Sequence, residues 1–298
     1  MLRLPRFVRN AIRRVRRSKA VPDAPLYFTS LSKKSDDDWR AALGESPENA
    51  AKWVYAAAIA GDNDAQMLWG RMLLDGYGTK ADADAAYRWF GIAATHRRPD
   101  AVTMLGRCHE RGWGVAPDDT EAAALYREAA AANEPWALFN LASLMLDGRG
   151  LAQDRDGAFR RFVQAALRGN NKAPNMIGHC YENGWGCARD LLRAAHWYRR
   201  AADAGDFRGA YRLGQWALEA GRIDDALTHL RAAVDNAPAP FCQVFAEELQ
   251  GQPDPRLRTL GAHASARAGR VMPASPTGAA SGRPHTPPSL QSAPASAR

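Results

Sequence analysis

The large, small and polar positions of this chain repeat every 36 residues. One column holds a large side chain in almost every repeat: Val54, Phe90, Tyr126, Phe162 and Tyr198. A second column is always small: Gly70, Gly106, Ala142, Gly178 and Gly214. Alanine pairs follow in step, at 57–58, 93–94, 129–130, 165–166 and 201–202. A fixed period of this length predicts one supersecondary unit that is stacked repeatedly as a solenoid.

Within each unit the apolar spacing predicts two helices joined by a glycine-containing loop. In the first unit these helices span about 65–74 and 83–95, and a helix over about 47–60 precedes them. The small column lets neighbouring helices approach closely, and the large column fills the space between them. An isolated helix pair cannot bury its apolar face, so stacking supplies the core. The expected fold is all-α: a right-handed αα-hairpin solenoid of about five 36-residue repeats.

The loop of each unit carries a Gly-x-Gly tripeptide, which predicts a structural turn. We expect these glycines to close the first helix through backbone conformations with positive φ. They are Gly76, Gly78, Gly112, Gly114, Gly148, Gly150, Gly184 and Gly186. No strand precedes the tripeptides and no Gly-Lys-Ser/Thr follows, which disfavours a phosphate-binding loop.

An aspartate precedes the second helix of each unit and is expected to be its N-cap. These residues are Asp82, Asp118, Asp154 and Asp190. Asp118 and Glu121 also have the spacing of a capping box, in which the glutamate bonds back to the N-cap backbone.

The columns together resemble the Sel1-like repeat, a relative of the tetratricopeptide repeat. The best match contains Ala101, Leu105, Gly106, Gly112, Gly114, Val115, Asp118, Ala122, Tyr126, Ala129 and Ala130. The resemblance covers roughly residues 47–237. It implies that the first helix of each hairpin lines a concave surface, along which partner peptides lie. Two positions depart from the pattern: Arg149 replaces the aromatic residue between two glycines, and Arg161 replaces a bulky residue.

Composition and spacing divide the chain into five parts. Residues 1–19 form a basic amphipathic segment, and 20–46 a linker with a short helix. Residues 47–238 form the Sel1-like or tetratricopeptide-like solenoid, and 239–250 a helix that caps its open end. Residues 251–298 are rich in Pro, Ala, Ser and Arg, and we expect them to be a disordered tail.

The net charge of +8 belongs to the two ends of the chain rather than to the solenoid. Residues 1–19 hold eight basic and no acidic side chains, and 251–298 hold six arginines and one aspartate. Residues 20–250 are therefore left with 26 basic and 31 acidic side chains. This acidic balance disfavours nucleic acid as a partner of the solenoid.

The basic segment over 2–17 has four interpretations, which the sequence leaves open. Leu4, Phe7, Ile12 and Val15 lie along one helical side and arginines along the other, which is typical of a helix on an anionic membrane surface. A presequence, a contact with nucleic-acid phosphates and a disordered arm are the alternatives. The chain has no apolar run of membrane-spanning length and no secretory signal pattern, so we expect a cytoplasmic protein, peripheral at the inner membrane through 2–17.

Candidate chemistry is sparse. The four cysteines form no CxxC pair, and Cys108 and Cys180 share an apolar column, which indicates buried hydrophobic side chains. A redox role of Cys180 and Cys187 stays open. The sequence contains no HExxH, no nucleophile elbow and no ligand quartet of suitable spacing. We therefore predict no catalytic residue, cofactor or metal. The alternative to a binding protein is a regulatory or accessory subunit of an enzyme, with any chemistry supplied by the partner.

The candidate binding residues lie in columns of the first helices that change identity from repeat to repeat. They are Arg71, Arg107, Arg111, Phe139, His179, Asn183, Tyr211 and Gln215. Met67, Thr103 and Asn175 are expected on the same concave side. The arginines, together with His179, suit the clamping of carboxylates on a partner protein or peptide. An ordinary solvated face would vary in the same way, so both interpretations stay open here.

Overall fold

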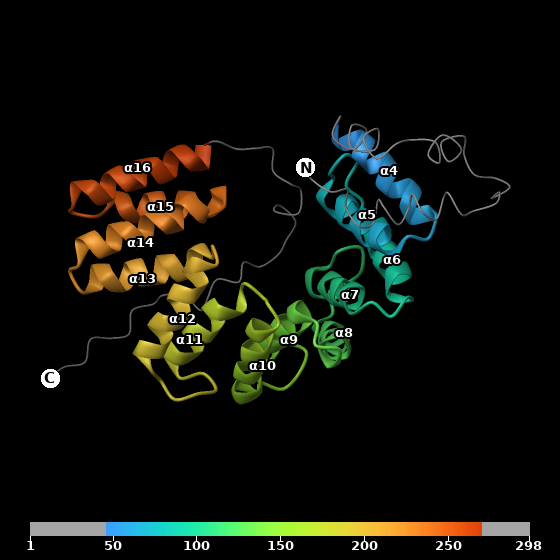
Figure 1. The fold of residues 1–298 in the computed structure, drawn as a ribbon, viewed down its shortest axis with the longest axis horizontal. Helices are drawn as coiled ribbons and strands as arrows, with labels where there is room; N and C mark the ends of the chain where they lie inside the picture. The colour runs from blue at the N-terminus through green and yellow to red at the C-terminus, as the bar shows by residue number, and fades with distance from the viewer. Residues whose placement is uncertain (1–45, 270–298) are drawn as a thin grey trace.

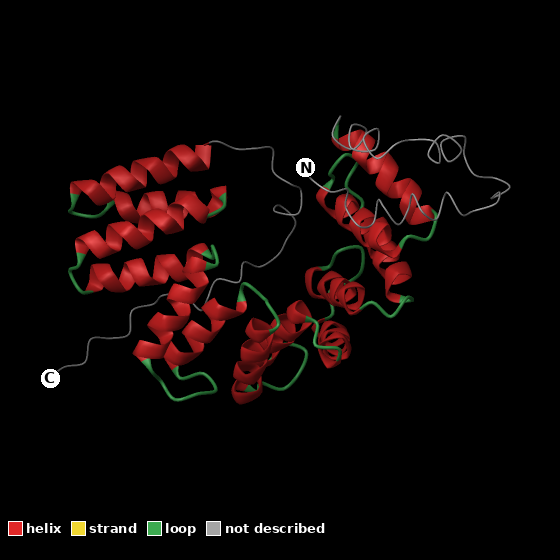
Figure 2. Ribbon diagram, in the orientation of Figure 1, coloured by secondary structure: helices red, strands yellow, loops and turns green. Residues whose placement is uncertain are grey.

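The computed structural model describes residues 46–269, and this part of the chain is entirely helical (Figures 1 and 2). A single helix, α4 (Pro47–Ile59), comes first. The hairpins that follow are α5 (Asn63–Asp75) with α6 (Ala83–Ala94), α7 (Pro99–Arg111) with α8 (Asp119–Ala131), α9 (Pro135–Asp147) with α10 (Arg155–Leu167), α11 (Ala173–Asn183) with α12 (Leu191–Asp203), α13 (Phe207–Glu219) with α14 (Ile223–Asn236), and α15 (Ala239–Gln250) with α16 (Pro255–Gly269). None of these helices is long and apolar enough to span a membrane.

The hairpins stack in chain order along a curved array. Figure 1 shows the array bending so that α4 and α16 stand at its two ends, on either side of an open space. First helices of successive hairpins pack directly on one another, α7 on α9 and α11 on α13. At the C-terminal end the second helices α14 and α16 are the ones that meet. From α7 to α13 the contacts between first helices agree with the inner position that the repeat pattern predicts for them, and we call their side of the array the inner side.

The predicted aspartate N-caps are confirmed in all four loops, but the capping box is not formed. Each aspartate side chain accepts a hydrogen bond from a backbone N–H two or three residues further on. The Asp118 backbone N–H donates instead to the carbonyl of His109, at 2.9 Å, so it is not available to Glu121. The same bond joins Asp82 to Leu73, Asp154 to Met145 and Asp190 to Tyr181. Each N-cap therefore also fastens the loop to the first helix of its hairpin.

The two glycines of each loop have different roles. Gly112 ends its helix in the left-handed conformation, with φ of 70°, as predicted. Gly114 also has positive φ, and a Cβ placed on it would lie 2.2 Å from the Ala83 carbonyl oxygen of the preceding hairpin. Gly78, Gly150 and Gly186 approach the starts of α4, α8 and α10 in the same way. The second glycine therefore sets the spacing between hairpins, which the sequence did not reveal.

The small and large columns pack against each other as the sequence predicts. A Cβ on Gly106 would lie 2.7 Å from the Tyr126 ring, and one on Gly178 would lie 2.6 Å from the Tyr198 ring. Both tyrosines are completely buried. A further position escaped the prediction: the turns that lead into α5, α7, α9, α11 and α13 each have a residue with positive φ, at 61, 97, 133, 169 and 205.

The C-terminal end differs from the prediction. The expected helix over 239–250 is present as α15, but the prediction of a disordered tail from Gly251 is wrong for Pro255–Gly269. This segment is α16, which packs on α15 through the buried side chains of Leu257, Leu260 and Ala264. The last described hairpin therefore ends the array with α16. The predictions for residues 1–45 and 270–298 lie outside the described residues.

Candidate partner-binding surface

All eight candidate binding residues lie on first helices, the helices that are predicted to line the inner side of the array. Arg71 lies on α5, Arg107 and Arg111 on α7, Phe139 on α9, His179 and Asn183 on α11, and Tyr211 and Gln215 on α13. Their surroundings differ, because some are engaged by other parts of the chain and some are not.

Met67, Thr103 and Asn175 do not face a partner, which corrects the prediction for that column. Their exposed fractions are only 3–4%. The Thr103 hydroxyl donates to the carboxylate of Glu134, at 2.8 Å, in the connection that leads into the next hairpin. Thr103 is thus covered by the start of the following hairpin, whereas Phe139 and Tyr211 of the same column remain half-buried.

The three arginines at the N-terminal end of the inner side form a cationic cluster, which we call the arginine patch: Arg71, Arg107 and Arg111. No carboxylate among the described residues lies within 4.0 Å of any of them. Arg71 is exposed and the other two are half-buried. The Arg107 guanidinium lies 5.1 Å from the centre of the Trp113 ring, which holds it in place without neutralising it. Among residues 46–269 the patch therefore has no ion-pair partner.

The middle of the inner side is aromatic. Phe139 is half-buried and meets the Phe162 ring edge-on, with the ring centres 5.5 Å apart. Trp136 packs on Phe139 and remains 44% exposed. The sequence prediction missed Trp136, although it lies one turn before Phe139 on the same face of the helix.

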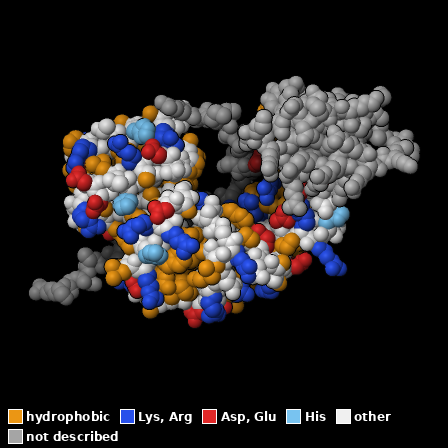
Figure 3. All heavy atoms as spheres, viewed as in Figure 1, with side chains coloured by type: hydrophobic (Ala, Val, Ile, Leu, Met, Phe, Trp, Pro, Cys, Tyr) orange, Lys and Arg blue, Asp and Glu red, His pale blue; other side chains and the backbone are white. Residues whose placement is uncertain are grey.

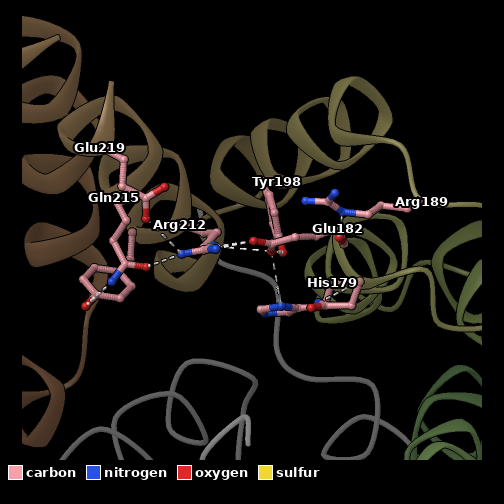
Figure 4. A network of polar contacts seen from close by, with 9 residues as sticks. His179, Glu182, Arg189, Tyr198, Arg212, Gln215 and Glu219 are labelled. Carbon is pink, nitrogen blue, oxygen red and sulfur yellow. Dashed lines mark hydrogen bonds and ion pairs between the residues drawn. The ribbon is translucent and has the colours of Figure 1, made fainter. Parts of the chain in front are cut away.

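The C-terminal part of the inner side is engaged in a polar network (Figure 4). Glu182 on α11 accepts hydrogen bonds from the Tyr198 hydroxyl, at 2.5 Å, and from Arg212 Nε, at 2.9 Å. Arg212 also donates to Gln215, at 3.0 Å. His179 Nδ1 lies 3.9 Å from Glu182. These contacts join α11, α12 and α13.

The remaining predicted residues of this region also have internal partners. Asn183 donates to the His179 carbonyl oxygen, at 2.9 Å. Tyr211 donates to Glu248, accepts from Gln215 at 2.8 Å, and stacks on Phe245. Since these side chains are committed within the chain, the arginine patch and the neighbouring aromatic residues are the better candidates for contact with a partner.

A second tyrosine–glutamate–arginine unit lies two repeats earlier. The Tyr126 hydroxyl donates to Glu110, at 2.8 Å, and Arg149 Nη2 donates to the other oxygen of Glu110, at 2.9 Å. Arg149 also lies 3.2 Å from Asp119. The arginine that replaces the loop aromatic thus forms a bridge to the preceding hairpin. The regular spacing of the two tyrosines and of the two glutamates was a signal that could have revealed both units.

The electrostatics of the network remove His179 from the predicted cationic clamp. Burial lowers the pKa of His179, so the imidazole is uncharged at neutral pH. Burial opposes the ionisation of Glu182, but hydrogen bonds from Arg212 and Tyr198 outweigh it and keep its pKa below the ordinary value. The positive charge on the inner side therefore comes from the arginine patch.

The lowered pKa of His179 predicts a loss of stability in mild acid. The unfolded chain binds a proton at a higher pH than the folded protein, so stability is complete above the ordinary pKa of 6.5 and falls as the pH drops through it. Urea unfolding at pH 7.5 and 5.5 should show a smaller pH-dependent loss for His179→Gln than for the wild type. The exposed His196 supplies the control, because His196→Gln should retain the full loss. Equal losses of stability in the wild type, His179→Gln and His196→Gln would contradict the assignment of this pH dependence to His179.

The cysteines have the surroundings of core side chains. Cys108 and Cys180 are completely buried, and burial raises the pKa of each thiol to about 12. Burial also raises the pKa of the half-buried Cys187. Thiols protonated at neutral pH are weak nucleophiles. Within residues 46–269 no three His, Cys, Asp or Glu side chains are grouped as a metal site would require.

The stacked hairpins and their inner surface define an αα-hairpin repeat solenoid. The family model described as Sel1 repeat matches residues 63–96, 99–134, 137–170 and 172–206. Residues 63–206 are therefore an array of Sel1 repeats, which confirms the Sel1-like repeat family predicted from the sequence. Proteins built from this repeat generally mediate protein–protein interactions. Helix α4 and the last two hairpins extend the array beyond the matched repeats.

Solved structures with the same fold include a Sel1 repeat protein from Oxalobacter formigenes, with 27% identity and a TM-score of 0.61 over 72% of this chain and 95% of that one. The protective antigen c5321 of uropathogenic Escherichia coli has 18% identity and a TM-score of 0.57, over 87% of this chain and 61% of its own. The immunity protein Pa5087 from Pseudomonas aeruginosa has 16% identity and a TM-score of 0.52, over 69% and 80%. A comparison with curated proteins found no match.

Proposed function

We propose that this protein is an adaptor or scaffold that binds a partner protein through the inner side of its solenoid. The bound segment carries carboxylates, which lie against the arginine patch, and apolar side chains, which lie against Trp136 and Phe139. The protein contributes binding without chemistry of its own.

The observation that carries this proposal is that the arginine patch has no ion-pair partner among residues 46–269. Elsewhere on the inner side the arginines are paired, as Arg212 is with Glu182 and Arg149 with Glu110. Three guanidinium groups without a carboxylate on one side of two adjacent hairpins favour an acidic ligand, since guanidinium binds carboxylate in a planar, two-pronged geometry. The inner helices also hold them on rigid elements, which limits the entropy that a partner must overcome.

The test is quantitative affinity purification with the wild type and with Arg71→Glu/Arg107→Glu. Reversing two charges of the patch should reduce recovery of the partner by about tenfold or more, because like charges across an interface are strongly unfavourable. Both side chains project from formed helices, so the helical circular dichroism should be unchanged.

The matched control is Arg88→Glu/Arg127→Glu. These exposed arginines lie on α6 and α8, the outer helices of the same two hairpins, and the net charge changes equally. A partner that binds the inner side is retained by the control and lost from the patch variant. Equal recovery with all three proteins would remove the inner surface from the proposal.

A further inference from the structure

A second basic surface lies on the outer side of the array, on helices α10 and α12. Six arginines lie on these helices and a seventh, Arg168, is the C-cap of α10; the six are Arg155, Arg160, Arg161, Arg193, Arg199 and Arg200. Among the described carboxylates, only Asp190 lies within 4.0 Å of one of them, at 3.3 Å from Arg193. Asp190 and Asp154 are occupied as N-caps, which leaves Asp156 and Asp203 as the other acids of these elements. The surface is therefore strongly cationic.

The same surface exposes leucines. Leu192 is 86% exposed, Leu167 is 74% exposed and Leu191 is 46% exposed. Figure 3 shows hydrophobic side chains gathered over the lower middle of the molecule, where α10 and α12 lie in Figure 1, with Lys and Arg side chains around them. Leu192 and Leu167 bury little surface in the fold, and exposed apolar side chains that are grouped in this way favour an interaction site.

The repeat pattern shows that Leu192 is not required by the fold. The equivalent position holds Asp84 in α6, Thr120 in α8 and Asp156 in α10. An acidic residue in the first turn of a helix stabilises it through the helix dipole, whereas leucine at that place gives no such benefit. The exchange thus exposes apolar surface and removes negative charge at the same point.

We infer that the outer face of α10 and α12 binds an anionic lipid surface. Arginines near the headgroups gain electrostatic attraction, and leucines beside them enter the boundary between headgroups and acyl chains. A second copy of this chain fits poorly, because a symmetric contact would bring the arginines against one another. Nucleic acid fits less well too, because Trp197 is half-buried with Arg200 over its ring, and the exposed leucines offer no stacking surface.

The test is flotation of the full chain with vesicles of phosphatidylcholine and phosphatidylglycerol at 70:30, compared with pure phosphatidylcholine vesicles. The variant is Leu192→Asp/Arg199→Glu. We expect the wild type to float with the anionic vesicles only. The variant should bind them at least about tenfold more weakly, because it reverses one charge and replaces one exposed apolar side chain by an acid.

The control is Thr120→Asp/Arg127→Glu, which makes the same changes at the equivalent positions of α8, two repeats earlier. It alters the net charge equally and leaves residues 1–19 intact, so it should bind as the wild type does. Thermal melts followed by circular dichroism verify folding of both variants.

Equal binding by variant and control, or no binding by the wild type, overturns the inference. Loss of binding to a 30-base-pair DNA duplex with unchanged vesicle binding also overturns it, in favour of nucleic acid. The result is independent of partner recovery through the arginine patch.

Discussion

Gly114→Ala should lower the free energy of unfolding by about 4 kcal/mol, although it adds a single methyl group. The new Cβ would lie 2.2 Å from the Ala83 carbonyl oxygen and 2.8 Å from the Asp84 Cα, both backbone atoms that cannot rotate away. The two hairpins would have to separate, which breaks the packing between them along their length. The left-handed φ of 68° adds its own cost of about 1 kcal/mol. Urea denaturation followed by circular dichroism measures the change.

Gly169→Ala separates the cost of the backbone conformation from the cost of the contact. Gly169 has φ of 89°, but a Cβ there would meet no atom within 4 Å. We expect a loss of only about 1 kcal/mol. Similar losses for the two variants would show that the second glycine of the loop is needed for its conformation alone, and would refute its role in hairpin spacing.

Glu182→Ala should destabilise the protein by about 3 kcal/mol, since it removes the main counterion of a largely buried guanidinium and leaves only Glu219, at 3.9 Å, among the described carboxylates. The Arg212 side chain is only 19% exposed, and the Tyr198 hydroxyl would also lose its acceptor. The loss should be smaller in Glu182→Ala/Arg212→Met, where the largely buried positive charge is removed as well. Thermal and urea unfolding of the single and double variants measure how far the contributions of Glu182 and Arg212 to stability depend on each other.

The comparison for this network is an exposed ion pair. Arg222 and Asp225 lie 3.1 Å apart, with both side chains at least 60% exposed. Asp225→Ala should leave the unfolding midpoint nearly unchanged, because water screens such pairs. If Glu182→Ala is as mild as Asp225→Ala, the network does not join the hairpins energetically.

The positions that repeat could be predicted from the sequence with good accuracy. The N-capping aspartates, the helix-ending glycines and the contact between the small and large columns all follow from local rules of helix capping and packing. Each rule acts within one hairpin and recurs in the next, so the same residue pattern appears several times along one chain. The placement of the eight candidate binding residues on first helices followed from the same register.

The features that escaped prediction depend on contacts between hairpins or on a single copy. Helix α16 occurs once, and the average composition of 251–298 concealed the helical spacing of Leu257, Leu260 and Ala264. Its start was signalled by Asp254 before Pro255, and Asp254 indeed accepts from the Arg256 N–H at 2.8 Å. The engagement of Tyr211 depends on Glu248, in the next hairpin. The distance between side chains of different hairpins cannot be derived from their spacing in the sequence.

The contact of each second glycine with the preceding hairpin has a consequence for how the chain folds. Gly114 meets Ala83, Gly150 meets Asp119 and Gly186 meets Arg155, in each case across the same short stretch of sequence. No such contact requires the ends of the array to find each other, so the entropy lost in closing each loop stays small. Chains with such local contacts fold fast for their length. Each hairpin packs on the one that was synthesised just before it. We therefore expect the array to fold in order from α4 as the chain emerges during translation.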